Sequence, residues 1–261
     1  MRKRLPYVYI WLVYAFLYIP ILVVIIFSFN DARFSTDWNG FTLKWYELLF
    51  KNQPLIDAMY NSLQVAVSAA TLATIMGSMA ALCIHRYKFT GKKILHGCIY
   101  MLTISPDIVM GIALLIFFVS INFELGFTTL LIAHVTLAMP FVTLTILARL
   151  AAFNENLIEA ARDLGASEAK SFWYVLLPLT APAVAAGWLL SFTLSLDDVL
   201  ISFFVTGPSF EILPLKIYSM VRLGVKPDIN ALSAIMFSLT LVFVVLAQIL
   251  ASPRKQYRQK D

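Results

Sequence analysis

The sequence predicts an all-α, polytopic membrane protein with six transmembrane helices. Of its 261 residues, 60% are hydrophobic and only 13% are charged, and the mean hydropathy is +0.81. A soluble domain carries about 25% charged residues. Six long apolar runs follow one another, and lysine and arginine gather in alternate loops between them. Together these features favour a single transmembrane domain over residues 1–261.

Each apolar run has the length of a membrane-spanning helix, because about 20 apolar residues cross the hydrocarbon core. Helices are expected because lipid does not tolerate unpaired backbone groups. The six expected spans are 7–29, 59–84, 94–121, 127–149, 180–205 and 231–251. No small-residue cleavage site follows the first run, so it is expected to be retained. The first span would be peripheral to a core formed by about residues 57–251.

The distribution of lysine and arginine predicts the orientation. Fourteen of these residues fall at the amino terminus, in the second and fourth loops and in the carboxy-terminal tail, and six fall on the other side. Loops rich in lysine and arginine stay in the cytoplasm. The protein is therefore expected in the cell (inner) membrane with both termini on the cytoplasmic side. The basic charge is a topology signal and gives no reason to expect nucleic acid as a partner.

Two shorter patterns lie in the first half of the chain. The stretch "FTLKWYELLF", residues 41–50, suits a short helix at the membrane interface. In the second span, small residues recur at helical spacing, which lets helices approach closely in lipid. They are Ala66, Ala70, Thr74 and Ser78, with Gly77 and Ala81 beside them. This face packs either within one bundle or toward a second subunit.

Residues typical of catalysis or metal binding show no supporting pattern. Cys83 and Cys98 lie near a basic loop expected in the cytoplasm, where disulfides are rare. His85, His96 and His134 have no metal-ligand spacing. There is no phosphate-binding glycine loop and no nucleophile–base set. The sequence therefore predicts no catalytic residue, no metal site and no cofactor site, and argues against a membrane-embedded enzyme.

A compact polar segment separates the fourth and fifth apolar runs. Asn156 is a suitable N-cap with Glu159 three residues later, and Gly165 suits a left-handed C-cap. Ser167 can cap a second short helix, and Pro178 marks the entry into the fifth span. The segment, residues 154–178, is predicted to be a helix–Gly–helix projection. It is either an interfacial hairpin that caps the bundle or a docking element for a cytoplasmic partner.

Three carboxylates fall inside predicted spans: Asp107, Asp197 and Asp198. Charges at such depth are costly and face a water-filled path or a partner. Pro106 can break the third span beside Asp107 and free carbonyl groups there. Every lysine and arginine falls in a predicted loop, a tail or a span edge, so the carboxylates have no obvious partner. Either they contact a cationic substrate, or they cap helix breaks and pair with neighbours.

The helix–Gly–helix segment resembles the EAA motif of ATP-binding-cassette (ABC) importer permeases. The matching residues are Glu159, Ala160, Ala161, Gly165, Leu177 and Pro178, with Val175 where the family usually has isoleucine. The resemblance implies the type I ABC importer permease (MetI-like) fold. It also implies that the segment is a coupling helix that docks into a cleft of an ATPase subunit.

A wider resemblance covers most of the chain. "ISPDIVMGIALL" and "SFTLSLDDVLISFFVTGPSFEILPLKIYSMV" are similar to permease subunits of spermidine/putrescine importers. This implies a non-catalytic subunit that forms half of a polyamine pathway with a second, homologous permease. Two cytoplasmic ATPase subunits would use ATP and magnesium, and an extracytoplasmic binding protein would deliver the polyamine. The alternatives are an importer for another small solute, or an ion-coupled secondary transporter or channel.

Overall fold

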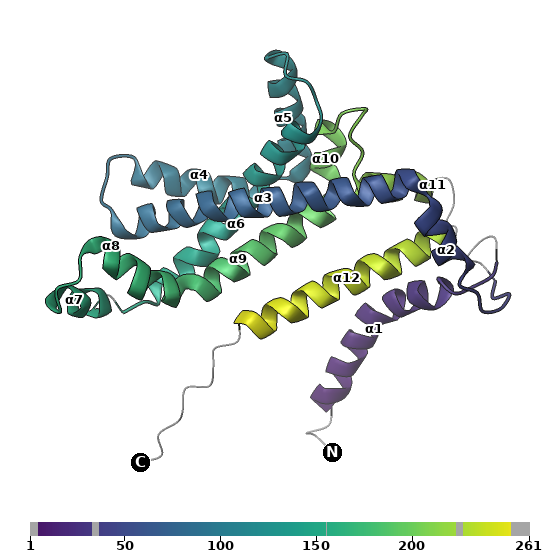
Figure 1. Cartoon of the computed structure of the whole chain (residues 1–261), viewed down its shortest axis with the longest axis horizontal. Helices are drawn as coiled ribbons and strands as arrows, with labels where there is room; N and C mark the ends of the chain where they lie inside the picture. The colour runs from purple at the N-terminus through teal and green to yellow at the C-terminus, as the bar shows by residue number, and fades with distance from the viewer. Residues whose placement is uncertain (1–4, 33–36, 155, 223–226, 252–261) are drawn as a thin grey trace. The chain divides into compact units, whose positions relative to one another are not determined.

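The computed structural model describes residues 5–32, 37–154, 156–222 and 227–251 (Figure 1). All named elements of this part are helical. They are α1 (Leu5–Phe27), α2 (Lys44–Lys51), α3 (Gln53–Arg86), α4 (Lys92–Ile104), α5 (Asp107–Ser120), α6 (Phe127–Ala151), α7 (Asn156–Asp163), α8 (Glu168–Ser171), the π-helix η1 (Phe172–Leu176), α9 (Leu177–Asp197), α10 (Leu200–Val205), α11 (Leu213–Arg222) and α12 (Pro227–Ala251). The basic amino terminus, the basic tail, Arg33 and Lys226 lie outside the described residues.

Apolar helices occupy all six places where the sequence predicts spans. Four described helices are long and apolar enough to cross a membrane, namely Tyr7–Phe27, Gln53–Arg86, Phe127–Ala151 and Glu168–Asp197. A fifth crossing results if the bent pair α4 and α5 forms one span. The sixth place is taken by α12, whose described apolar stretch, Asp228–Val242, is shorter. The multi-pass, all-α prediction is confirmed, and the count of six is approximate.

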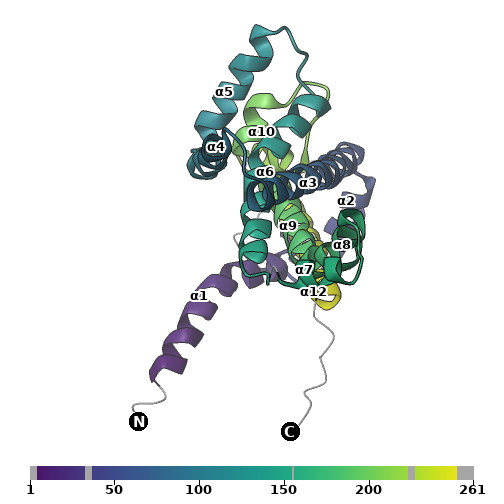
Figure 2. The same ribbon diagram turned by 90° about the vertical axis from the view of Figure 1, so that its left-hand side faces the viewer.

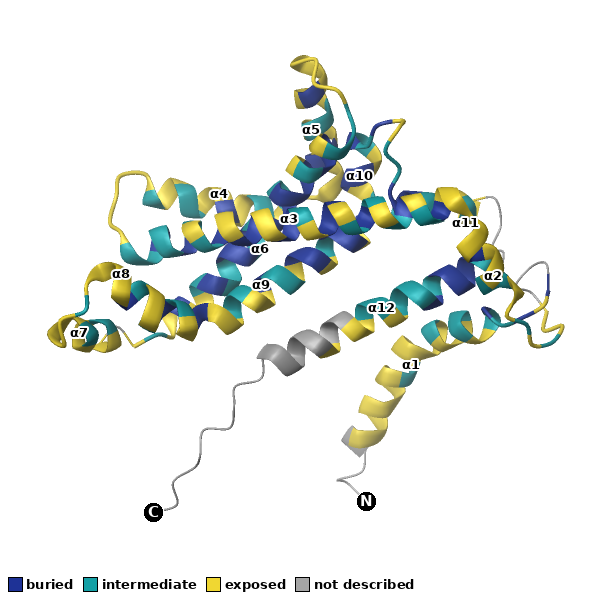
Figure 3. Ribbon diagram, in the orientation of Figure 1, coloured by how far each residue is buried: buried dark blue, intermediate teal, exposed yellow. Residues whose placement is uncertain are grey.

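The chain divides into two compact units, and the first contains residues 1–60 and 215–242. Its helix α1 is exposed along most of its length (Figure 3), as expected for a span that meets lipid. After α1, the hydroxyl groups of Ser28 and Tyr46 lie 2.7 Å apart, and Trp45 Nε1 donates to the Asn30 carbonyl at 2.7 Å. These bonds fix the predicted short helix, α2, against the end of α1.

The second unit contains residues 61–214 and 243–261, and its core lies between α3, α6 and α9. Ala66 and Ala70 of α3 pack against Phe192 and Leu196 of α9. A Cβ added at Gly77 would lie 2.8 Å from the side chain of Val142 on α6. Small residues therefore allow the close approach that the sequence predicted, and this face packs within the chain's own bundle.

The third and fifth predicted spans differ from straight helices. The third bends by 112° between α4 and α5, at Ser105-Pro106, as Figure 1 shows. The fifth was predicted as 180–205, which is wrong at both ends. Its helix runs from Glu168 through the π-helix η1 and ends at Asp197. Pro178 and Pro182 do not begin a new helix: η1 leads directly into α9, which has Pro178 in its first turn and Pro182 inside it.

Candidate functional site

The helix–Gly–helix segment ends its first helix in a Schellman motif. Gly165 has φ of +84°, a conformation that favours glycine. Its N–H donates to the Arg162 carbonyl at 2.8 Å, and the Ala166 N–H donates to the Ala161 carbonyl at 3.0 Å. These two bonds satisfy the last carbonyls of α7. The predicted glycine C-cap is confirmed.

The two helix starts in this segment were predicted with unequal success. Ser167 Oγ accepts from the Lys170 N–H at 3.4 Å, so the predicted cap of the second helix is confirmed. The predicted N-cap of α7, Asn156, is wrong by two residues. The side chain of Asn154, rather than that of Asn156, accepts a backbone N–H, at 3.1 Å. Glu155 lies outside the described residues.

One face of α7 anchors the segment and the other is open. Ile158 packs against the buried core that contains Leu150 and Leu176. Leu157 and Leu164 point outward, and Leu164 is 90% exposed. These two leucines are separated by about two helical turns and so share one face. A short polar helix thus presents an apolar strip that none of the described residues covers.

One ion pair joins this segment to the end of α3, and a second lies within the segment. Glu168 Oε1 lies 2.6 Å from an Arg162 nitrogen and 3.1 Å from an Arg86 nitrogen. Glu159 is exposed and lines a cavity of about 300 Å³ together with Arg86, Arg162 and Leu176. Figure 2, which faces this end of the second unit, shows α7 and α8 together there. The segment is therefore held to α3 by the Arg86–Glu168 pair, and it is continuous with α9 through η1.

The break between α4 and α5 leaves its carboxylate exposed. Pro106 is extended, with ψ of 133°, and stands as the N-cap of α5. Asp107 is the first residue of α5 and its side chain is exposed. The hydroxyl of Ser105 donates to the Met101 carbonyl at 2.8 Å and so closes the end of α4. The sequence predicted this break from the proline, and the structure has it there.

The break between α9 and α10 has a buried carboxylate. Asp198 accepts hydrogen bonds from the backbone N–H groups of Ile201 and Ser202 at 3.2 and 2.8 Å. It also accepts from the Ser202 hydroxyl at 2.7 Å, and its Oδ2 lies 3.5 Å from His134 Nε2. The other ring nitrogen of His134 is 2.6 Å from the Ser195 hydroxyl. The expectation that the carboxylates lack a partner is therefore wrong for Asp198.

The adjacent carboxylate, Asp197, is the last residue of α9 and is exposed. Helices α5 and α10 pack along each other, with Gly111 against Ile201 and Phe204. Asp107 lies one turn before Gly111 in α5, and Asp197 lies four residues before Ile201, on the other side of the α9–α10 break. The structure thus brings both helix breaks to the same end of one helix pair.

Sequence reasoning missed His134 and Ser202 as members of this network. His134 was examined for metal ligands, and its actual partners are hydroxyl and carboxylate oxygens. Asp198 followed by an apolar run, with Ser202 one turn on, is the pattern of a helix N-cap inside a span. That pattern was the available signal. Among the described residues there is no group of three His, Cys, Asp or Glu side chains that could hold a metal ion.

Comparison with known families identifies the class of protein. Residues 73–252 match the family model described as "binding-protein-dependent transport system inner membrane component". The chain belongs to this family. It is therefore a multi-pass membrane component of a transport system and is non-catalytic, as the sequence predicted.

The curated relatives of this chain include polyamine permeases. The chain is 51% identical over 249 residues to the spermidine/putrescine transport system permease protein PotC of Escherichia coli K12, covering 95% of this chain and 94% of the relative. It is 50% identical to PotC of Haemophilus influenzae, covering 93% and 94%. It is 37% identical to the putrescine transport system permease protein PotI of E. coli K12, covering 95% and 91%.

Solved structures show the same fold at low sequence identity. A bacterial ABC transporter that imports the acidic polysaccharide alginate matches with a TM-score of 0.70 at 17% identity, covering 96% of this chain and 98% of that one. An amino acid ABC transporter matches with a TM-score of 0.62 at 20% identity, covering 80% and 98%. The type I ABC importer permease fold predicted from the EAA motif is confirmed.

Proposed function

We propose that this chain forms half of the pathway through which an ATP-driven importer moves polyamines across the inner membrane. The relatives at 50% identity or more carry spermidine and putrescine in their names, and the 37% relative carries putrescine. The observation that carries the proposal is the segment after α6, an exposed helix–Gly–helix unit in a chain of this family. A channel or an ion-coupled transporter would have no need for it.

The coupling role rests on the geometry of α7. Its inner face is fixed by Ile158 in the core, and its outer face presents Leu157 and Leu164 to a partner. The EAA residues are arranged accordingly. Glu159, Ala160 and Gly165 are exposed, Ala161 and Leu177 are half-buried, and Pro178 is exposed. An ATPase subunit that grips this strip would move α3 through the Arg86–Glu168 pair and α9 through η1.

The substrate path is proposed to run past the exposed carboxylates. Polyamines are elongated polycations, and Asp107 and Asp197 are exposed side chains at the same end of the α5–α10 pair. Asp198 was an equal candidate in the sequence, but its oxygens already accept three hydrogen bonds. We therefore assign substrate contact to Asp107 and Asp197 and a capping role to Asp198.

The remaining partners follow from this reading. A second, homologous permease completes the pathway, and two ATPase subunits supply ATP and magnesium chemistry on the cytoplasmic side. An extracytoplasmic polyamine-binding protein delivers the substrate; one of the fold relatives is described in complex with a periplasmic protein. The proposed domain is the whole chain, with a core of about 57–251 and both termini in the cytoplasm.

Uptake of radiolabelled spermidine by the reconstituted complex tests the substrate. We expect uptake that needs ATP and the binding protein, and that excess putrescine reduces. Asp107→Asn and Asp197→Asn should each lower uptake at low spermidine about tenfold while complex yield stays unchanged, because asparagine keeps the shape and removes the charge. ATP-driven uptake of a neutral sugar or an anion in place of spermidine would refute the proposal.

The coupling role has its own test. Gly165→Val forces a β-branched residue into positive φ and should break the Schellman turn. We expect lost ATPase association or lost ATP-driven uptake, with normal membrane insertion. Gly97→Val on α4 is the matched control, because a Cβ there meets open space. Normal uptake by both Gly165→Val and Glu159→Lys would leave the segment as a structural hairpin.

A further inference from the structure

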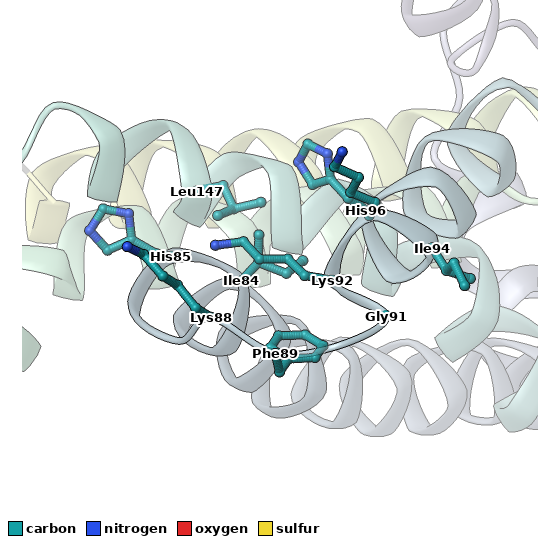
Figure 4. Close-up of a pocket in the computed structure, with 10 residues that line it drawn as sticks. Ile84, His85, Lys88, Phe89, Gly91, Lys92, Ile94, His96 and Leu147 are labelled. Atoms are coloured by element: carbon teal, nitrogen blue, oxygen red, sulfur yellow. The ribbon is translucent and has the colours of Figure 1, made fainter.

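A basic cavity of about 830 Å³ lies at the turn between α3 and α4 (Figure 4). Its polar lining consists of His85, Lys88, Lys92, Lys93 and His96, with no carboxylate among the lining residues. Figure 4 shows His85 and His96 at opposite ends, with the Lys92 side chain extending between them. The charge of this cavity is therefore positive and suits an anion.

The turn that carries these residues is built rigidly. Gly91 has φ of +97° and stands as the N-cap of α4. Lys92 Nζ donates to the Tyr87 carbonyl at 3.2 Å, which ties the start of α4 to the end of α3. Within the described ranges, Lys88 and Lys93 form no ion pair. Two lysines beside a helix amino terminus are thus left with uncompensated charge.

An apolar track begins where the basic cavity ends. The remaining walls include Ile84, Phe89, Ile94 and Leu147. Ile94 is 73% exposed, and the same face of α4 continues through Cys98 to Met101 and Ile104, which are 72% and 79% exposed. These four positions follow helical spacing and form one stripe. A cationic end joined to an apolar stripe matches the shape of an amphiphile.

We propose that this cavity binds the phosphate headgroup of an anionic phospholipid, with the acyl chains along the exposed face of α4. Basic pockets between transmembrane helices bind such headgroups. A free phosphate ion would use only the lysines, and an acidic protein segment would leave the α4 stripe uncovered. A phospholipid would fill both the basic cavity, with its headgroup, and the apolar stripe of α4, with its acyl chains. It would hold the α3–α4 turn beside Arg86, which pairs with Glu168 of the helix–Gly–helix segment.

The test uses the complete transporter in nanodiscs of equal phosphatidylglycerol and phosphatidylcholine. Native mass spectrometry counts the lipids that stay bound after release. We expect preferential retention of phosphatidylglycerol, and about tenfold weaker retention in the double variant Lys88→Gln/Lys93→Gln. Lys92 is left intact because its amine closes the turn. The control, Lys44→Gln/Lys51→Gln, removes the same charge from exposed positions of α2 and should retain lipid normally.

Further arms separate the possible ligands. Millimolar inorganic phosphate should not displace the lipid, because the ion cannot occupy the apolar stripe. Equal retention in the double variant and the parent, or equal loss in the α2 control, would overturn the proposal. So would displacement by phosphate alone. Loss of a partner subunit with unchanged lipid retention would assign the cavity to an acidic protein segment. The readout does not involve transport and stands whatever the substrate is.

Discussion

The two helix breaks of the second unit share a composition and differ in how their carboxylates are used. Each break has an aspartate with a serine shortly before it in the chain: Ser105 precedes Asp107, and Ser195 precedes Asp198. At the first, the carboxylate is exposed and proline makes the bend. At the second, the carboxylate is buried and itself ends one helix and starts the next. One break is set by covalent geometry and the other by hydrogen bonds.

This difference separates a carboxylate that is free for a ligand from one that the fold requires. The proline break holds its shape without the help of Asp107, so that side chain can change without unfolding the bend. The second break contains no proline or glycine. The polar network, together with the packing of α10 against α5 and α6, holds α10 away from a continuous α9. Position in a span is therefore insufficient to assign a carboxylate to substrate.

The largest expected effect is at Asp198. Asp198→Ala removes the acceptor of two backbone N–H groups, of the Ser202 hydroxyl and of the His134 contact. Unsatisfied buried groups of this kind cost roughly 3 kcal/mol in total. We expect a large fall in the thermal midpoint of the purified complex and reduced yield. Asp197→Ala, the exposed neighbour, should change stability by less than about 0.5 kcal/mol. Similar midpoints for the two variants would contradict a structural role for Asp198.

An intermediate loss of stability is expected at Gly111, where α5 packs against α10 close to both breaks. A Cβ at Gly111 would lie 2.7 Å from the Phe204 ring and 3.3 Å from Ile201 Cα. Gly111→Ala should therefore separate α5 from α10 and cost about 1–3 kcal/mol. Gly97→Ala in α4 should be stabilising by about 0.5–1 kcal/mol, since alanine is the better helix former and has open space there. Thermal unfolding of both variants checks this pair; a stabilising Gly111→Ala would contradict the packing.

The orientation of the chain in the membrane can be tested at the two ends of the bent α4–α5 pair, which contains the first break. If both termini are cytoplasmic and α4–α5 crosses as one bent span, a single cysteine at Asn122, just after α5, should be labelled from outside intact cells. The test needs the Cys83→Ser/Cys98→Ser background. A cysteine at Lys88, in the turn before α4, should be protected. Labelling at Lys88 and protection at Asn122 would invert the topology, and equal labelling would mean that α4–α5 re-enters on one side.

The sequence placed one break at its proline, whereas at Asp198 it offered capping of a helix break only as an alternative, and the difference has a physical reason. Proline acts on its own backbone and on the residue before it, so Ser105-Pro106 carries a local signal. The second break has a local N-cap pattern in Asp198 and Ser202, but its network also includes His134, which comes from α6 and is distant in the chain. No local pattern reports a partner that folding brings in. The same reason explains why the fifth span was misplaced, since η1 continues the helix through residues that look like a boundary.

More of the helix–Gly–helix segment could be predicted from the sequence. Its glycine C-cap and its second N-cap depend on neighbours within a few residues, and both were identified from the sequence. Its inner and outer faces were not separated, because Leu157 and Ile158 are equally apolar. Only the location of the core decides that Ile158 is buried while Leu157 faces outward. Local chemistry fixes the turns, and the packing fixes which face remains for a partner.

The smallest expected effect is at Ser105, whose hydroxyl is compared with that of Ser202 at the second break. Ser105 donates only to the Met101 carbonyl within its own helix, and its side chain is half-buried. Ser105→Ala leaves Pro106 in place, so the 112° bend should persist at a cost of no more than about 0.5 kcal/mol. Ser202→Ala removes a buried donor to Asp198 and a contact to His134 Nε2 at 2.9 Å, and should cost about 1–2 kcal/mol. Thermal midpoints of the two alanine variants, measured side by side in the same detergent, give the comparison. If Ser105→Ala is the more destabilising of the two, proline does not by itself hold the first break, and Asp107 would have to be counted among the groups that the bend requires.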